Sequence, residues 1–326
     1  MKHSFSFRLA CRDDKSSIVR FLDEHWGARH PLVHLDDFFT YYYEDGDRLQ
    51  FALCETQGRI AALAGYIRAN ACEHPDIWIS IWCADKSVSG AGMELLDALP
   101  RLCGARMAAC NNIRPQVVSL YRFLGYEACR LPHYYRLADR SSYAVARIAQ
   151  KTILPVADGP ALLPVQDACQ LAQVYVSHPE LRPFKDLWYL TRRYFSYPRQ
   201  HYDLWHLNGS LLATRTVPVN GTAVLRIVDY VGLPEQFPEF GPGINRLMQQ
   251  VGAEYADCYC AGISAAQMAS AGFCQRTETD ANILPNYLTP PLYENTEYYY
   301  STTESDHFLL FKADGDQDRP NLPALD

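Results

Sequence analysis

The fold is decided by residues 79–126, which read ISIWCADKSVSGAGMELLDALPRLCGARMAACNNIRPQVVSLYRFLGY. An apolar run typical of a strand comes first, and the turn S-V-S-G-A-G at 87–92 then leads into an amphipathic helical pattern. A second strand and a second helix follow, ending at Gly125-Tyr126. Glycines let main-chain amides approach an anion, and a helix N-terminus favours negative charge. The stretch therefore predicts a phosphate-binding turn with the hydroxyl of Tyr121 one element away.

The pattern occurs a second time about 150 positions later. Gly243 opens the helix INRLMQQV as Gly92 opens MELLDALPRL, and the two last helices end at Gly125 and Gly272. Before each turn lie a predicted hairpin and a strand: 50–55, 59–68 and 77–84 in the first half, and 202–207, 211–217 and 224–231 in the second. We predict two copies of one α/β unit, 1–145 and 146–326, joined within the proline-rich stretch 140–163.

Composition excludes several classes of protein. The 326 residues are 48% hydrophobic and 21% charged, with a net charge of −7, which argues against a nucleic-acid-binding surface. No apolar run is long enough for a membrane span and the N-terminus lacks a signal sequence, so we expect a cytoplasmic protein. Because the eleven cysteines are odd in number and irregularly spaced, we expect reduced thiols.

Two short patterns resemble metal sites, but each lacks ligands that a complete site needs. Cys258-Tyr-Cys260 has no second pair of ligands. Asp314-Gly-Asp316-Gln-Asp318 begins like a calcium loop, but Pro320 interrupts it and no glutamate closes it. We predict no metal, and interpret the acidic run as an interaction or capping tail after a strand at 308–312.

The order of predicted elements resembles the GNAT family of acyl-CoA-dependent N-acyltransferases. Gly90 and Gly92 match the family's glycine turn, whereas Ser87 stands where the family carries Gln or Arg. The resemblance implies an α/β (α+β) fold of two tandem GNAT-like domains, each a mixed, mainly antiparallel sheet flanked by helices. It also implies acyl-CoA as cosubstrate, with no tightly bound cofactor. The residues that it places at the coenzyme are Trp82, Cys83, Ser87, Val88, Ser89, Gly90, Ala91, Gly92 and Asn112.

The family motif Leu-Tyr-x-x-x-Gly-Phe matches Leu120-Tyr121-x-x-x-Gly125-Tyr126. The resemblance implies that Tyr121 protonates the departing thiolate of coenzyme A. A base is also needed to take a proton from the acceptor amine. His30 and His34, in the loop that would cover the acceptor, are the first candidates, and Asp85 is the next. A loop histidine more often binds or packs than catalyses.

The second copy differs at its turn. The stretch 232–243 carries prolines, which remove amide donors, and glutamates, which oppose an anion. We predict that the first half binds coenzyme A and that the second, degenerate half completes the acceptor site and has a structural role. The inverse assignment stays open.

The whole chain also resembles tandem-GNAT sugar N-acyltransferases of bacterial surface-polysaccharide (lipopolysaccharide O-antigen) pathways. The resemblance rests on H-P-L-V-H at 30–34, the aromatic helix 39–43, and the stretches 283–288 and 311–321. It implies transfer of an acetyl or 3-hydroxyacyl group, such as 3-hydroxybutanoyl, to the amino group of a dTDP-3-amino-3,6-dideoxyhexose by a monomer or homodimer. The predicted substrate-binding residues are Tyr41, Tyr42, Arg182, Lys185, Tyr189, Arg193, Asn286 and Tyr287.

The sequence leaves three alternatives open. The cations between Arg182 and Arg193 would hold a diphosphate or form a solvated helix face, on which Lys185, Tyr189 and Arg193 are spaced as helix neighbours. The protein could instead be a non-catalytic tandem-GNAT ligand-binding or scaffold protein. It could also be an aminoacyl or peptidoglycan-type transferase, although a tRNA-binding surface needs more positive charge than this chain carries.

Overall fold

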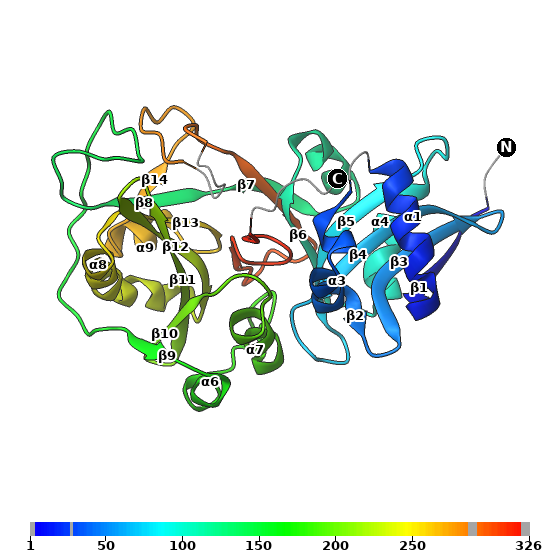
Figure 1. Ribbon diagram of the computed structural model, residues 1–326, viewed down its shortest axis with the longest axis horizontal. Coiled ribbons are helices and arrows are strands. Elements are labelled where there is room, and N and C mark those ends of the chain that lie inside the picture. Colours follow the sequence, from blue (N-terminus) through cyan, green and yellow to red (C-terminus); the bar gives the residue numbers. More distant parts are fainter. Residues whose placement is uncertain (1–3, 27–28, 286–291, 321–326) are drawn as a thin grey trace.

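The computed structural model describes residues 4–26, 29–285 and 292–320. It has two halves that lie side by side, with the C-terminal segment between them (Figure 1). The described strands form two sheets of eight strands each, and within each sheet one pair of neighbouring strands is parallel. The predicted pair of α/β halves with mixed, mainly antiparallel sheets is confirmed.

The first half follows the predicted order, with hairpin β3–β4 around the turn at Gly58. Its elements are β1 (Ser6–Cys11), α1 (Lys15–His25), α2 (Pro31–His34), α3 (Asp36–Tyr43), β2 (Glu44–Asp45), β3 (Arg48–Thr56), β4 (Arg59–Arg68), β5 (Asp76–Ala84), α4 (Ala91–Leu102), β6 (Met107–Ile113), α5 (Val118–Phe123), β7 (Glu127–Leu131) and β8 (His133–Leu137).

The second half begins after a connection, 138–162, without described helix or strand. Its elements are β9 (Leu163–Val165), α6 (Ala168–Val174), α7 (Leu187–Phe195), β10 (Asp203–Leu207), β11 (Ser210–Val219), β12 (Thr222–Val231), α8 (Gly241–Gln250), β13 (Ala253–Ala261), α9 (Ala265–Ser270), β14 (Cys274–Arg276), β15 (Tyr298–Thr302) and β16 (Leu310–Phe311). The predicted strand 308–312 is thus shorter than expected.

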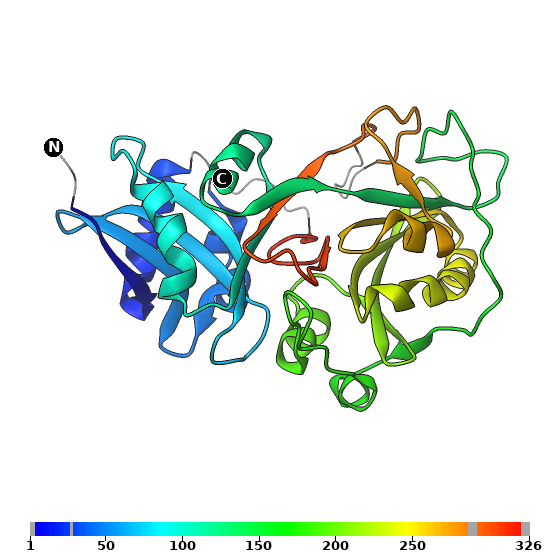
Figure 2. The ribbon, with the colours of Figure 1, turned by 180° about the vertical axis from the view of Figure 1, so that it is seen from behind.

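The two halves exchange a strand. β8 follows β7 in sequence but lies in the second sheet, between β13 and β14. In return, β15 lies in the first sheet, between β6 and β7. Figure 2 shows the two strands crossing from one half to the other. Each sheet therefore contains a strand from the other part of the chain, and the predicted division at residue 145 separates β8 from the sheet in which it pairs.

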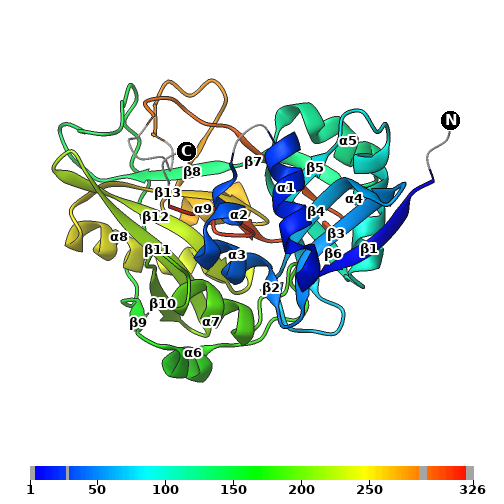
Figure 3. The same cartoon turned by 45° about the vertical axis from the view of Figure 1, so that its right-hand side comes forward.

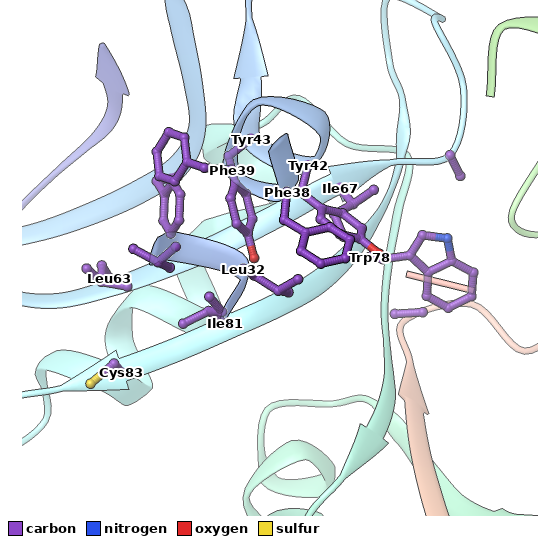
Figure 4. Packing of buried hydrophobic residues seen from close by; sticks show 14 of the residues in the cluster. Leu32, Phe38, Phe39, Tyr42, Tyr43, Leu63, Ile67, Trp78, Ile81 and Cys83 are labelled. Atoms are coloured by element: carbon purple, nitrogen blue, oxygen red, sulfur yellow. The ribbon is translucent and has the colours of Figure 1, made fainter. Parts of the chain in front are cut away.

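Helices cover both faces of the first sheet. On one face, Phe21 of α1 and Phe38, Phe39 and Tyr43 of α3 pack on β3, β4 and β5 (Figures 3 and 4). The other face packs against α4, through Leu95 and its buried neighbours, and against α5. α4 is amphipathic, with its apolar residues at helical spacing toward the sheet, as the sequence pattern predicts.

The second sheet is covered in the same way, by α8 and α9 on one face and by α6 and α7 on the other. α7 begins at Leu187, because the Asp186 side chain accepts a hydrogen bond from the Tyr189 amide and caps the helix there. Lys185 therefore precedes the helix. The expected helical face shared by Lys185, Tyr189 and Arg193 does not form.

Candidate functional site

Strands β5 and β6 pair over a short distance and then separate. Their parallel pairing covers Asp76–Trp78 opposite Met107–Ala109, although β5 continues to Ala84 and β6 to Ile113. Just beyond the last pair, Ser80 and Ile81 of β5 face the single residue Gly65 of β4, which is a β-bulge. We call this point, where β5 and β6 diverge, the first fork. In such a bulge the extra residue is left out of the strand pairing, here at Ser80 and Ile81.

An equivalent second fork follows the parallel pairing of β12 and β13, which ends at Ile227 and Cys258. The chain's own C-terminal segment fills it. β16 pairs antiparallel with β13, and the amide of Ala313 donates to the carbonyl of Val228 at 2.8 Å. Leu310, Phe311 and Ala313 are fully buried there. Main-chain atoms therefore occupy the second fork on both strands.

Tyr121 lies at the first fork, on the face that α4 and α5 cover. It is 2% exposed, its ring packs edge-on against Tyr126, and its hydroxyl is hydrogen-bonded to the thiol of Cys110. Cys110 is the first residue of β6 after the last β5–β6 pair. Burial and the neighbouring thiol raise the pKa of Tyr121 well above 10, and burial raises the pKa of Cys110 to about 12. Both groups stay protonated near neutral pH, so Tyr121 can donate a proton and Cys110 is a poor nucleophile.

The glycine turn lies between β5 and α4. Gly90 has φ +89°, which favours glycine, and a Cβ on Gly92 would lie 2.9 Å from the Cβ of Ala84. The indole of Trp82 donates to the carbonyl of Gly92 at 3.1 Å, which joins β5 to the first turn of α4. The amides at the start of this 12-residue helix suit an anion.

Asp85 belongs to the same turn. Its carboxylate accepts hydrogen bonds from the amide and the hydroxyl of Ser87, at 2.8 and 2.7 Å, and these bonds lower the pKa of Asp85. The carboxylate therefore shapes the turn, and its charge opposes an anion that binds there.

The two histidines of the covering loop lie at the ends of α2. Nδ1 of His30 accepts from the amide of Leu32 at 3.3 Å, so in the neutral ring Nε2 carries the hydrogen. Burial, aided by Arg319, lowers the pKa of His30 to about 4. His34 lies between the carboxylate of Asp23, at 2.5 Å from Nε2, and the guanidinium of Arg29, at 3.2 Å from Nδ1. Each ring thus has internal partners, and the role of either as base stays a prediction.

The predicted substrate-binding cations face the interior. The ammonium of Lys185 contacts Asp229 and Asp314, and the guanidinium of Arg193 donates to the carbonyls of Ala313 and Gln317. Arg182 donates to nearby carbonyls of its own loop. These cations hold the chain's own segments together, and no solvated basic face forms from Lys185 and Arg193.

The remaining predicted residues are dispersed. Tyr42 is buried, with its hydroxyl 2.8 Å from that of Tyr197, and Tyr41 packs against Tyr197 and Arg192. Tyr189 is buried in the second half, and Cys83 is buried on the α1 face of β5. Asn112 follows the first fork on β6 and donates to Gln317 at 3.1 Å. Asn286 and Tyr287 lie outside the described residues.

The structure adds residues to the first fork that sequence reasoning missed. Ser80 Oγ is 2.8 Å from the hydroxyl of Tyr43 and donates to Asp316 at 3.0 Å, while Asn111 donates to main-chain carbonyls of the C-terminal segment. Ser80 was visible as the one hydroxyl in an otherwise apolar strand. Asp316 belongs to the acidic run that was interpreted as a tail.

No group of metal-ligating side chains occurs in the part of the chain that the structure describes. None of its described helices combines the length and the apolar character that a membrane span requires.

No family model and no curated protein matches this sequence. Solved structures do match. One is a conserved protein of unknown function from Enterococcus faecalis V583, with 10% sequence identity and a TM-score of 0.51. The match covers 91% of this chain and 72% of the E. faecalis chain. GCN5-related N-acetyltransferases from Anabaena variabilis (13% identity, 92% and 72% coverage, TM-score 0.48) and Kribbella flavida (12%, 92% and 71%, 0.46) are also similar.

At such identities the likeness concerns the fold. It extends over nine-tenths of the chain, both halves included. The class that the topology defines is an α/β protein of two GNAT-like halves.

Proposed function

We propose that this protein is an acyl-CoA-dependent N-acyltransferase whose coenzyme binds at the first fork. One observation carries the assignment: the first fork has the glycine turn at one end and the protonated Tyr121 beside it, whereas main chain fills the second fork. This supports the first half as the coenzyme-binding half and the second as its structural partner, which supplies β15 and the C-terminal segment.

The proposed reaction is direct transfer. The neutral amine attacks the thioester carbonyl carbon, the C–N bond forms, and the C–S bond breaks. β5 amides freed by the bulge at Ser80 would stabilise the developing oxyanion, and the amides at the start of α4 would bind the pyrophosphate. The thiolate takes its proton from Tyr121, which regains one from solvent, and the nitrogen releases a proton to give the neutral amide.

For the acceptor we propose the amino group of a dTDP-3-amino-3,6-dideoxyhexose, and for the acyl group acetyl or 3-hydroxybutanoyl. This finer assignment rests on the resemblance of the whole chain to tandem-GNAT sugar N-acyltransferases. Lys185 and Arg193 are engaged by the C-terminal segment, so a diphosphate would need cations other than these two.

The test is a thiol-release assay on the full chain. Acetyl-CoA and 3-hydroxybutanoyl-CoA are each paired with a panel of dTDP-amino sugars, simple aliphatic amines and matched hydroxy compounds. We expect thiol release that depends on the amine. Binding of coenzyme A, measured by calorimetry, without thiol release for any pair would favour the scaffold alternative.

A pair of charge substitutions, one in each half, tests which half binds the coenzyme. Ser89→Glu places a negative charge at the glycine turn, and we expect it to weaken coenzyme A binding at least about tenfold. Gln236→Glu places the same charge at the corresponding turn of the second half and is expected to leave binding unchanged. The opposite pattern would assign the coenzyme to the second half.

A further inference from the structure

The C-terminal segment Asp314–Arg319 is held in place by buried contacts from the second half. Asp314 Oδ1 lies 2.7 Å from the ammonium of Lys185, and Asp318 Oδ1 lies 2.8 Å from the guanidinium of Arg215. Arg193 donates to the carbonyl of Gln317 at 2.8 Å. The anchors on either side of Asp316 fix the position of this carboxylate, in a segment whose backbone runs between the halves (Figure 1).

Asp316 makes its contact with the other half. Its Oδ2 accepts a hydrogen bond of 3.0 Å from Ser80, the residue in the β5 bulge. Asp316 is 9% exposed. Its Oδ1 accepts a hydrogen bond of 2.6 Å from the side chain of Gln317, and its Oδ2 lies 3.2 Å from the guanidinium of Arg319. A carboxylate from the end of the chain therefore lies at the first fork, on the side away from Tyr121.

The strand opposite Ser80 presents a second acceptor. Asn111 of β6 is 4% exposed, and its Nδ2 donates to the carbonyls of Phe311 and Asp314 at 3.0 and 3.2 Å. Its Oδ1 is buried and has no hydrogen-bond partner among the residues that the structure describes. A buried acceptor without a donor is costly, so the site favours a ligand that brings N–H groups.

We propose that Asp316 binds the ammonium group of the acceptor at the first fork, with Asn111 Oδ1 as a second acceptor. An ammonium has three N–H donors and one positive charge, which suit a carboxylate and an amide oxygen. The favoured acceptor class is then a primary amine that is protonated in solution, such as an amino sugar, over a neutral arylamine. The proposal rests on the proposed function and adds the residue that selects the amine.

The residues of the acidic run 314–318 then have two roles. Asp314 and Asp318 anchor the segment to cations of the second half, and Asp316 faces the substrate. The second half thereby contributes to a site whose coenzyme belongs to the first half. A purely structural role for Asp316, as a cap on Ser80, is the competing explanation and predicts a different kinetic result.

The experiment compares Asp316→Asn with Asp318→Asn in the full-length protein. Asn keeps a hydrogen-bond acceptor for Ser80 and removes the charge, and Asp318→Asn makes the same change two residues away, at Arg215. For an aliphatic primary amine we expect Asp316→Asn to raise KM about 10- to 100-fold. We expect an unchanged KM for acyl-CoA, an unchanged KM for a neutral arylamine, and partial recovery with Asp316→Glu. Equal effects on charged and neutral acceptors, or no effect on either, would overturn the proposal.

A binding measurement keeps this test separate from the proposed function. Calorimetry in the presence of coenzyme A compares a dTDP-amino sugar with the matched sugar that carries a hydroxyl group in place of the amine. The wild type is expected to prefer the amine, and Asp316→Asn to lose that preference, whether or not the protein turns over. If the wild type binds both sugars equally, or binds neither, the inference is wrong. If it prefers the amine but releases no thiol with any acyl-CoA, the proposed acyl transfer fails while the ammonium site stands.

Discussion

The ammonium of Lys185 lies 2.7 Å from Oδ1 of Asp314 and also contacts Asp229 of β12 at 2.6 Å. Lys185 and Asp314 are 129 positions apart in sequence, and all three groups are buried. The pair attaches the C-terminal segment to the second half at the second fork. A lysine that the sequence suggested as a phosphate ligand is therefore an internal anchor.

Replacement of Lys185 tests this anchor. Lys185→Met leaves two carboxylates in the interior without their cation, and we expect the free energy of unfolding to fall by about 3–5 kcal/mol. Urea denaturation of the variant and the wild type measures the loss. Lys151→Met removes an exposed partner of Asp139 and serves as the control, with little expected change. Equal stability of the two variants would show that Lys185 is not an anchor.

Asp314 gives the anchor a pH dependence. Burial, together with the charge of Asp229, raises the pKa of Asp314 to about 7, against the opposing effect of Lys185. An unfolded aspartate has a pKa of about 3.9, so between about pH 4 and pH 7 the folded state binds more protons than the unfolded state. This group therefore lowers stability as pH rises through that window. We expect the unfolding free energy of the wild type, relative to Asp314→Asn, to be larger at pH 5 than at pH 7.5. A constant difference, or a rise with pH, would contradict the raised pKa.

Sequence periodicity predicted the elements at the first fork well, because each is defined by local signals. β3 and β4 flank a glycine turn, β5 is an apolar run, and Gly90 and Gly92 mark the start of α4. The partners of these elements were not predictable in the same way. No local pattern in Tyr298–Tyr300 indicates that this stretch pairs with β6, about 190 positions earlier.

The acidic run shows why the site, like the strand pairing, was not predictable from local sequence. Alternating carboxylates at Asp314, Asp316 and Asp318 look locally like part of a metal loop or a solvated tail. Their partners, Lys185, Ser80 and Arg215, come from distant elements that only the folded chain brings together. Burial likewise decides the environment of His30. Its position in the covering loop suggested a base, and the fold lowers its pKa to about 4 and engages its Nδ1 with the amide of Leu32.

The proposed acid is tested by removal of one oxygen atom. Tyr121→Phe retains the packing against Tyr126 and removes the hydroxyl beside Cys110. We expect kcat to fall about 100-fold or more with little change in coenzyme A affinity. Tyr126→Phe is the matched control, because Tyr126 lies in the same cluster and its buried hydroxyl has no partner among the described residues. Similar kcat values for the two variants would remove Tyr121 from the mechanism.

Substitution of Asp85 distinguishes a structural role of its carboxylate from a catalytic one. If its carboxylate only shapes the turn, Asp85→Asn keeps an acceptor for Ser87 and removes a charge that opposes the pyrophosphate. We then expect coenzyme A to bind about two- to fivefold more tightly, with kcat nearly unchanged. A loss of about 100-fold in kcat would instead identify Asp85 as the base. Asp97→Asn, on the exposed side of α4, controls for the change in net charge.

The exchange of strands predicts that neither half folds alone. A fragment 1–145 lacks β15, so β6 and β7 lose the strand between them, and β8 has no sheet to join. The fragment 146–326 lacks β8 between β13 and β14 and carries β15 unpaired. Because unpaired strands expose main-chain donors and acceptors, we expect each fragment to aggregate or to unfold without a cooperative transition, as measured by thermal circular dichroism.

Mixing the two fragments supplies all the strands and should restore a single cooperative transition. The matched control is the full-length protein cut once within the connection 148–161, where no strand is interrupted. We expect this nicked protein to unfold as one unit, because β8 and β15 still tie the halves together. A cooperatively folded, monomeric 1–145 fragment would show that β15 is dispensable for the first sheet. The C-terminal carboxylates would then reach the first fork by docking of independent domains, not through a shared fold.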